Sequence, residues 1–194
     1  LARQGLPMVV WGASLADALY PQVGGDNAMG GYLATRHLID RGCRRIAFFG
    51  DTTHPEAGLR FAGYARALAE AGIPLDPKLQ QSFLFGDLRI REVIDGWLDQ
   101  QLSFDGIFAS SDVTAISIIG ALNERGVQVP QQVRLVGYDD IALAEHVHPP
   151  LTTVRQPTLE AGRALVELLF EAMAGQPRRT VTLPTRLIER ESSR

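Results

Sequence analysis

The sequence has little cysteine and no long apolar run. Its 194 residues contain one cysteine, Cys43, so the chain cannot form an internal disulfide, and a lone thiol fits a reducing compartment better than a secreted protein. No apolar run approaches the roughly 18 residues that span a bilayer, and the opening LARQGLPMVVWGA lacks the parts of a secretory signal. These absences indicate a cytoplasmic protein without a membrane segment. No nearby histidine marks Cys43 as a nucleophile, so we interpret it as a small hydrophobic residue.

The sequence also lacks an excess of basic residues. The formal net charge is −3, and the arginines are scattered. Nucleic-acid binding through counterion release needs a basic surface, so any contact with DNA is expected from a segment outside this chain. The chain has no initiator methionine, and its first residues run almost at once into a predicted strand. We therefore expect it to be an internal piece of a larger protein.

The motifs of nucleotide-binding proteins and of common enzymes are missing. The glycine-rich stretch at 24–31, GGDNAMGG, has neither the Lys-Ser/Thr of a P-loop nor the spacing of a dinucleotide fingerprint. There is no G-x-S-x-G elbow and no recognisable order of Ser, His and Asp. His146 and His148 form an H-x-H pair without a further Cys or His, which is more typical of polar surface than of a zinc site. We expect no catalysis, no cofactor and no metal.

What the sequence does contain is a regular alternation of strand and helix patterns. Nearly continuous runs rich in Val, Ile and Phe, typical of parallel strands covered on both faces, occupy residues 8–11, 45–50, 82–85, 106–109 and 133–137. Helical patterns lie among them at 27–41, 58–71, 88–101, 113–125 and 159–174. This order predicts right-handed βαβ units in an open, doubly wound α/β sheet.

Helix ends are marked by capping residues. Asp112 is predicted as the N-cap of the helix at 113–125, and Asp26 or Asn27 as the N-cap of the helix at 27–41. Glycines stand where a left-handed C-cap residue is most easily accommodated, at Gly42, Gly72 and Gly126. Two further glycines, Gly30 and Gly31, fall in the first turn of the helix at 27–41, where they indicate close backbone packing or a moving boundary.

The helix at 113–125, VTAISIIGALNER, is apolar over well over half of its circumference. This is wider than the stripe that one sheet needs. A second side of the helix is therefore expected to be buried, either between elements of its own chain or at a subunit interface.

Charged residues gather at one predicted sheet edge. Asp139 and Asp140 follow the strand at 133–137, and open α/β sheets bind ligands at the carboxyl ends of their strands. We expect one carboxylate to cap the next short helix and the other to contact a ligand; a metal is the weakest alternative, because further oxygen ligands are missing. Arg60 starts a helix on the same edge and is, on local sequence, either a surface charge or a ligand contact.

Five segments together resemble the effector-binding core of the lac repressor (LacI/GalR) family of bacterial transcription regulators. They follow in the family's order and extend over nearly the whole chain from Pro7 onward. The segments are DNAMGGYLATRHLIDRGCRRIAFFG, LRFAGYARALAEAGI, IFASSDVTAISIIGALNERGVQVPQQVRLVGYDDI, HPPLTTVRQP and LPTRLIERESS.

The resemblance implies a type I fold similar to periplasmic sugar-binding proteins. Two doubly wound parallel-sheet lobes would be joined by three crossovers, with a small ligand between them. Residues 1–25 and 156–182 would form a partial, incomplete N-terminal lobe, and residues 26–155 and 183–194 the C-terminal lobe. Hinge residues would be Gly24, Gly25, Val154, Arg155 and Gln156. The family's helix-turn-helix DNA-binding domain is absent from this sequence.

The resemblance also implies roles for single residues. Arg60 and Asp139 match an effector-contacting arginine and aspartate, which can grip hydroxyl groups with charge-assisted hydrogen bonds. Three effector-site positions depart from the family: Gly12 replaces an Asp, Leu88 an aromatic ring, and Ser111 an Asn. The effector is therefore expected to be smaller, less polar or differently oriented than a usual hexose. The family dimerises through the helix at 113–125, which implies interface positions Val113, Ile116, Ile119 and Gly120.

The implied function is sensing. The chain would be the effector-binding and homodimerisation core of a transcriptional repressor that binds a sugar or related metabolite and meets operator DNA through an N-terminal domain outside this chain. A sugar-binding protein of a transport system is the alternative with the same fold, and a sugar-modifying hydrolase is the enzymatic one.

Overall fold

The protein has an α/β fold with two separate sheets. The computed structural model describes residues 6–15, 17–83 and 89–194. The larger sheet has six strands in the order β4-β3-β5-β6-β7-β9, all parallel except β9, which runs antiparallel to β7. These strands are β3 (Ile46–Phe49), β4 (Gln80–Gln81), β5 (Gly106–Ala109), β6 (Arg134–Asp139), β7 (Thr152–Arg155) and β9 (Arg186–Ile188).

Helices cover both faces of the larger sheet. On one face, α1 (Asn27–Asp40) and α2 (Pro55–Glu70) pack Leu38 and Tyr64 against Phe48 and Phe108. On the other face, α3 (Ile90–Asp99) and α4 (Asp112–Glu124) form a second apolar cluster with the alternate strand residues. All four residues of β3 and of β5 are buried. The continuous apolar runs therefore belong to central parallel strands, as the sequence predicts.

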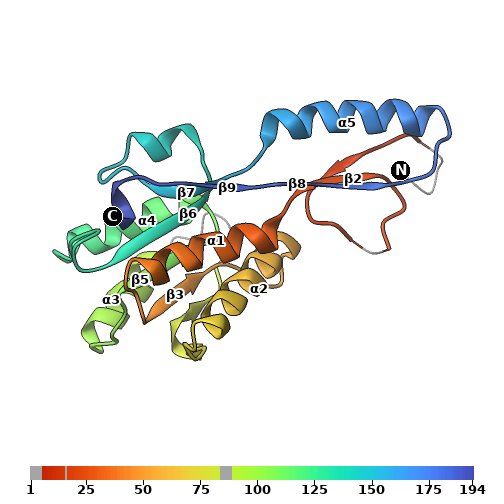
Figure 1. The fold of residues 1–194 in the computed structure, drawn as a ribbon. Helices are drawn as coiled ribbons and strands as arrows, with labels where there is room; N and C mark the ends of the chain where they lie inside the picture. Colours follow the sequence, from red (N-terminus) through yellow and green to blue (C-terminus); the bar gives the residue numbers. More distant parts are fainter. Residues whose placement is uncertain (1–5, 16, 84–88) are drawn as a thin grey trace.

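The smaller sheet has three parallel strands in the order β1-β2-β8. They are β1 (Val10–Trp11), β2 (Gln22–Gly25) and β8 (Thr180–Leu183), and α5 (Thr158–Met173) packs beside them at the far end of the molecule (Figure 1). The chain passes between the two sheets three times, after Gly25, after Arg155 and after Leu183. Short 3₁₀ helices complete the described elements: η2 (Pro77–Leu79), η3 (Ala142–Glu145) and η4 (Glu191–Ser193).

One predicted strand has a different position in the structure, and three strands were not predicted. The predicted strand at 82–85 is wrong at its start, because β4 pairs Gln80 and Gln81 with Phe48 and Phe49. Phe83 lies after the strand and stacks on Phe49 in the core, which accounts for its apolar pattern; residues 84–85 lie outside the described residues. Strands β2, β8 and β9 carry no continuous apolar run and were not predicted.

The capping predictions are confirmed at most positions. Asp26 accepts a hydrogen bond from the Met29 amide and is the N-cap of α1, and the three predicted C-cap glycines have positive φ angles: Gly42, Gly72 and Gly126. Asp112 is not an N-cap. Ser111 takes that place in α4 with its side chain on the Thr114 amide, and Asp112 is the first helical residue.

The apolar surplus of α4 is covered largely by the chain itself. Ile118 and Leu122 belong to the apolar cluster that also includes Ile94 and Trp97 of α3. Ile119, one of the implied interface positions, is 4 % exposed and packs in this cluster; its role at an interface stays a prediction. The remaining positions implied for the interface, Val113, Ile116 and Gly120, stay a prediction.

Close packing of two helices sets the position of α2. A Cβ added at Gly31 would lie 2.0 Å from the Arg60 carbonyl oxygen, and one at Gly63 would lie 2.0 Å from the Ala28 carbonyl oxygen. Only glycine lets α1 and α2 approach this closely. Gly31 therefore serves close packing, and its contact with the Arg60 carbonyl helps to position the backbone of Arg60.

Among the described residues, no helix combines the length and the hydropathy that crossing a membrane requires.

Candidate functional site

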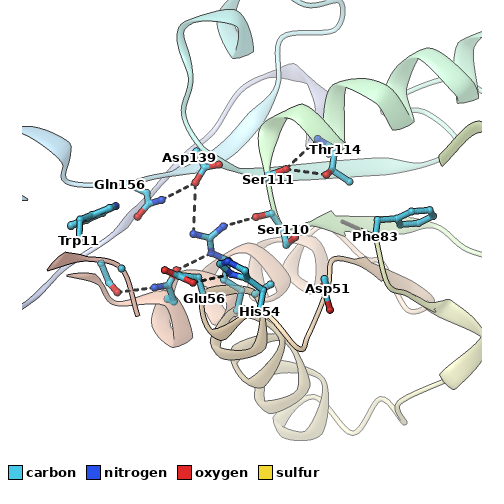
Figure 2. Close-up of a pocket in the computed structure, with 15 residues that line it drawn as sticks. Trp11, Asp51, His54, Glu56, Phe83, Ser110, Ser111, Thr114, Asp139 and Gln156 are labelled. Carbon is cyan, nitrogen blue, oxygen red and sulfur yellow. Dashed lines mark hydrogen bonds and ion pairs between the residues drawn. The ribbon is translucent and has the colours of Figure 1, made fainter. Parts of the chain in front are cut away.

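A cavity of about 330 Å³ lies where the two sheets meet. This volume is at the lower end of the range of about 300 to 1,000 Å³ that is usual for small-molecule sites. The smaller lobe contributes Trp11, Gly12 and Gly25, and the larger lobe contributes residues of α1, α2, α4 and β6 (Figure 2). The two lobes therefore share one concave site.

Arg60 lies at the centre of the polar contacts in this cavity. Its Nε donates to Asn27 Oδ1 at 2.8 Å and its Nη1 to the Ser110 carbonyl at 2.5 Å. Its Nη2 forms an ion pair with Asp139 at 3.7 Å, and the guanidinium carbon lies 3.7 Å from the centre of the Tyr138 ring. The side chain is 9 % exposed. Arg60 is thus held in one orientation before any ligand arrives, and the surface-charge alternative does not hold.

Asp139 ends β6 with its carboxylate at the cavity. Its backbone has a φ of 113°, a region that non-glycine residues adopt rarely and at a cost in energy. Gln156 Nε2 donates to its Oδ1 at 2.8 Å. Burial raises the pKa of Asp139, while the Arg60 guanidinium and the Gln156 amide oppose this shift. The pairing stabilises a carboxylate that can still accept hydrogen bonds.

Asp140, in contrast, takes part in ion pairs outside the cavity. It forms ion pairs with Arg155 and with Arg190, the latter at 2.8 Å, and it does not line the cavity. The expectation that one of the two aspartates caps the following helix is wrong, because η3 begins after Ile141 without a side-chain cap. Among the described residues, no group of three His, Cys, Asp or Glu side chains is placed to hold a metal.

Gly12 and Ser111 both line the cavity, with different constraints. Ser111 Oγ donates to Thr114 Oγ1 at 2.9 Å and accepts from the Thr114 amide, so its hydroxyl is engaged in capping α4. A Cβ at Gly12 would lie 2.8 Å from Glu56 Oε1. The carboxylate of Glu56 therefore occupies the space where position 12 would place a side chain. The cavity thus has a carboxylate acceptor at the place of the Asp that Gly12 replaces.

The aromatic contribution to the cavity comes from other positions than the one expected. Leu88 lies outside the described residues. Trp11, which is 37 % exposed, and Phe83 both line the cavity. Figure 2 places them toward opposite ends of the site. The exposed indole offers an apolar surface on which a ligand ring can pack.

The implied hinge residues lie at two of the passages between sheets. Gly24 and Gly25 are the last residues of β2, Val154 and Arg155 end β7, and Gln156 follows. A Cβ at Gly24 would lie 2.1 Å from the Gly12 carbonyl oxygen, so glycine is required there by close contact between β2 and the cavity loop. Movement at these residues stays a prediction.

Several cavity residues were missed from the sequence. Glu56 precedes Arg60 by four positions on α2 and thus shares a helix face with it, a signal that the sequence contains. Asn27 follows the first passage between the sheets and opens α1 at the same sheet edge. The other residues that were missed carry no comparable signal: Trp11, Asp51, His54, Ala57, Phe83, Ser110 and Thr114.

Comparison with known proteins agrees with this fold. Residues 35–193 match a periplasmic binding protein-like domain. A transcriptional regulator of the LacI family from Sanguibacter keddieii is 34 % identical with a TM-score of 0.88, and the match covers 96 % of this chain and 72 % of that one. The chain belongs to the LacI family.

Other LacI-family members support the assignment. The transcriptional regulator CelR of Thermobifida fusca is 36 % identical over 99 % of this chain and 58 % of its own length. A complex of a CelR regulator with cellobiose has a TM-score of 0.89 over 97 % of this chain and 59 % of that chain. A LacI-family regulator from Enterococcus faecium with bound ribose is 29 % identical with a TM-score of 0.88, over 98 % of this chain and 72 % of that one. The chain spans about half the length of the curated relatives that it matches, which are named as transcriptional regulators or repressors.

Proposed function

We propose that this chain is the effector-sensing core of a cytoplasmic transcriptional repressor that binds a sugar or related metabolite and catalyses nothing. The observation that carries the proposal is that Arg60 and Asp139 meet in one cavity shared by the two lobes. The neighbours with bound cellobiose and ribose support a saccharide as the ligand class.

The proposal includes a division of the chain into lobes. Residues 1–25 and 156–182 belong to a partial N-terminal lobe, and residues 26–155 and 183–194 to the C-terminal lobe; the sheet order supports this division. A ligand that binds better to one relative orientation of the lobes shifts the protein toward that orientation. The preference reaches operator DNA through a homodimer and a DNA-binding domain outside this chain.

The partly buried face of α4 around Val113 and Ile116 supports the dimer. Gly120, exposed and with no neighbouring atom near its Cβ position, would allow close approach of a second copy.

The test is DNA binding by the full-length protein. We expect sequence-specific binding whose affinity changes when cellobiose, ribose or another bound saccharide is added, by about 1 to 3 kcal/mol of coupling free energy. A full-length protein without sequence-specific DNA binding, with and without these sugars, contradicts the proposal.

A further inference from the structure

We propose that Glu56 is a specificity-determining residue that restricts this site to uncharged, hydroxyl-rich ligands. The inference rests on the proposed sensing function and adds the charge class of the ligand. Its basis is the position of the Glu56 carboxylate between the lobes and the balance of charges around the cavity.

Glu56 joins the two lobes directly. It lies in the first turn of α2, and its Oε1 accepts a hydrogen bond at 2.9 Å from the amide of Ala13, which belongs to the loop after β1. The same oxygen fills the space beside Gly12, and Oε2 lies 2.9 Å from His54 Nδ1 (Figure 2). These contacts hold the carboxylate in one place, facing the cavity.

The Glu56 carboxylate keeps capacity for a ligand. Each carboxylate oxygen can accept two hydrogen bonds, and each has one described partner. The side chain is about one quarter exposed and lines the cavity. Its remaining lone pairs can therefore accept from ligand hydroxyl groups in a short, charge-assisted geometry.

The charges of the cavity disfavour an anionic ligand. Three carboxylates line it, those of Asp51, Glu56 and Asp139, and the guanidinium of Arg60 is their one arginine counterpart among the lining residues described. That guanidinium is already engaged by Asn27, the Ser110 carbonyl and Asp139. A phosphate or a sugar acid would meet one guanidinium that is already paired with Asp139, and the further carboxylates of Asp51 and Glu56, the latter beside the imidazole of His54. In a partly desolvated space these like charges repel an anion strongly. A neutral polyol meets acceptors on both lobes instead.

The experiment uses matched pairs of probes that differ in charge. Affinities of the full-length protein are measured by calorimetry for ribose against ribose 5-phosphate and for cellobiose against cellobionate. We expect the unmodified protein to bind at least one neutral member, and to bind it at least tenfold more tightly than its anionic counterpart. In Glu56→Gln, which keeps the shape and the acceptor for the Ala13 amide, this preference should fall at least fivefold.

The control is Glu70→Gln, which removes the same charge from the last residue of the same helix, outside the cavity lining. It should leave the preference unchanged. An anionic probe that binds as tightly as its neutral partner overturns the inference, and so does a preference that Glu56→Gln leaves intact. If neutral binding is lost in Arg60→Ala while Glu56→Gln changes nothing, the sensing function stands and the role of Glu56 falls. If no member of either pair binds, the inference falls, because it predicts binding of at least one neutral member.

Discussion

The two lobes of this protein differ in how much of their apolar surface they bury. The larger lobe covers both faces of a six-stranded sheet and holds two extensive apolar clusters. The smaller lobe has three strands and one helix around a core of three buried residues: Val23, Ala161 and Leu168. Its helix α5 leaves Leu159, Phe170 and Met173 more than 60 % exposed. The larger lobe therefore buries an extensive apolar core of its own, whereas the smaller lobe leaves much of the apolar surface of α5 exposed.

This difference bears on how the site works. The larger lobe holds the polar network of the cavity, which is formed by Arg60, Asn27 and Asp139. The smaller lobe adds Trp11, Gly12 and the amide of Ala13. A site whose polar groups are held in place before binding loses less entropy on association. The larger lobe therefore supplies the pre-organised half of the cleft, and the smaller lobe supplies the half that can adjust.

The largest effect is expected in the aromatic core of the larger lobe. Phe48 is 1 % exposed and its ring lies within 5.5 Å of the rings of Phe61, Tyr64 and Phe108. Phe48→Ala should lower the free energy of unfolding by about 3 to 5 kcal/mol, because it removes a buried ring and leaves a cavity. The matched change Phe170→Ala on α5, where the ring is 66 % exposed, should change this chain by less than about 0.5 kcal/mol. Urea unfolding of both variants checks this. Equal losses would show that the two lobes are not different in the way described.

A second and smaller effect concerns a buried carboxylate of the larger lobe. Asp112 is fully buried and accepts from Thr153 Oγ1 at 2.5 Å and from the Ile141 amide at 2.9 Å. Burial raises the pKa of Asp112 to about 6, and those two hydrogen bonds offset only part of the shift. The folded protein thus binds this proton more tightly than the unfolded chain does.

The stabilisation from the Asp112 proton is fully present below the ordinary pKa of an aspartate and is lost as the pH rises through about 6. We therefore expect unfolding at pH 5 to require about 1 to 3 kcal/mol more free energy than at pH 8 from this group. Asp112→Asn keeps one oxygen that can accept from the Ile141 amide, and its amide nitrogen can donate to Thr153 Oγ1 in place of the second bond. Because Asn does not titrate, this change should flatten that part of the profile. The measurement is urea unfolding of both proteins at the two pH values, and an identical pH dependence would refute the assignment to Asp112.

The larger lobe could be predicted from sequence much better than the smaller one. Its central strands are short, continuous apolar runs such as IAFF and GIFA, and three of its helices, α1, α2 and α4, are followed by glycines with positive φ angles. Strands β2 and β8 of the smaller lobe, QVGG and TVTL, pair over more than 150 positions of sequence and have no such run. A local sequence pattern cannot predict pairing between strands so far apart in the chain.

The site was predictable only in part for a similar reason. Resemblance to the family pointed to Arg60 and Asp139, which the fold brings within 3.7 Å of each other. Glu56 was missed, although it stands one helical turn before Arg60, because its role depends on the loop after β1 lying against α2. The apolar width of α4 was read correctly as two-sided burial, but periodicity alone does not separate α3 from a second subunit.

The most direct test of the central claim is calorimetry of Arg60→Ala with a saccharide that binds the unmodified full-length protein. Loss of one charge-assisted hydrogen bond costs about 1.5 to 3 kcal/mol, so the account predicts affinity weakened by more than tenfold, with the larger lobe still folded by circular dichroism. An affinity that Arg60→Ala leaves unchanged would contradict the claim that this cleft is the sensing site.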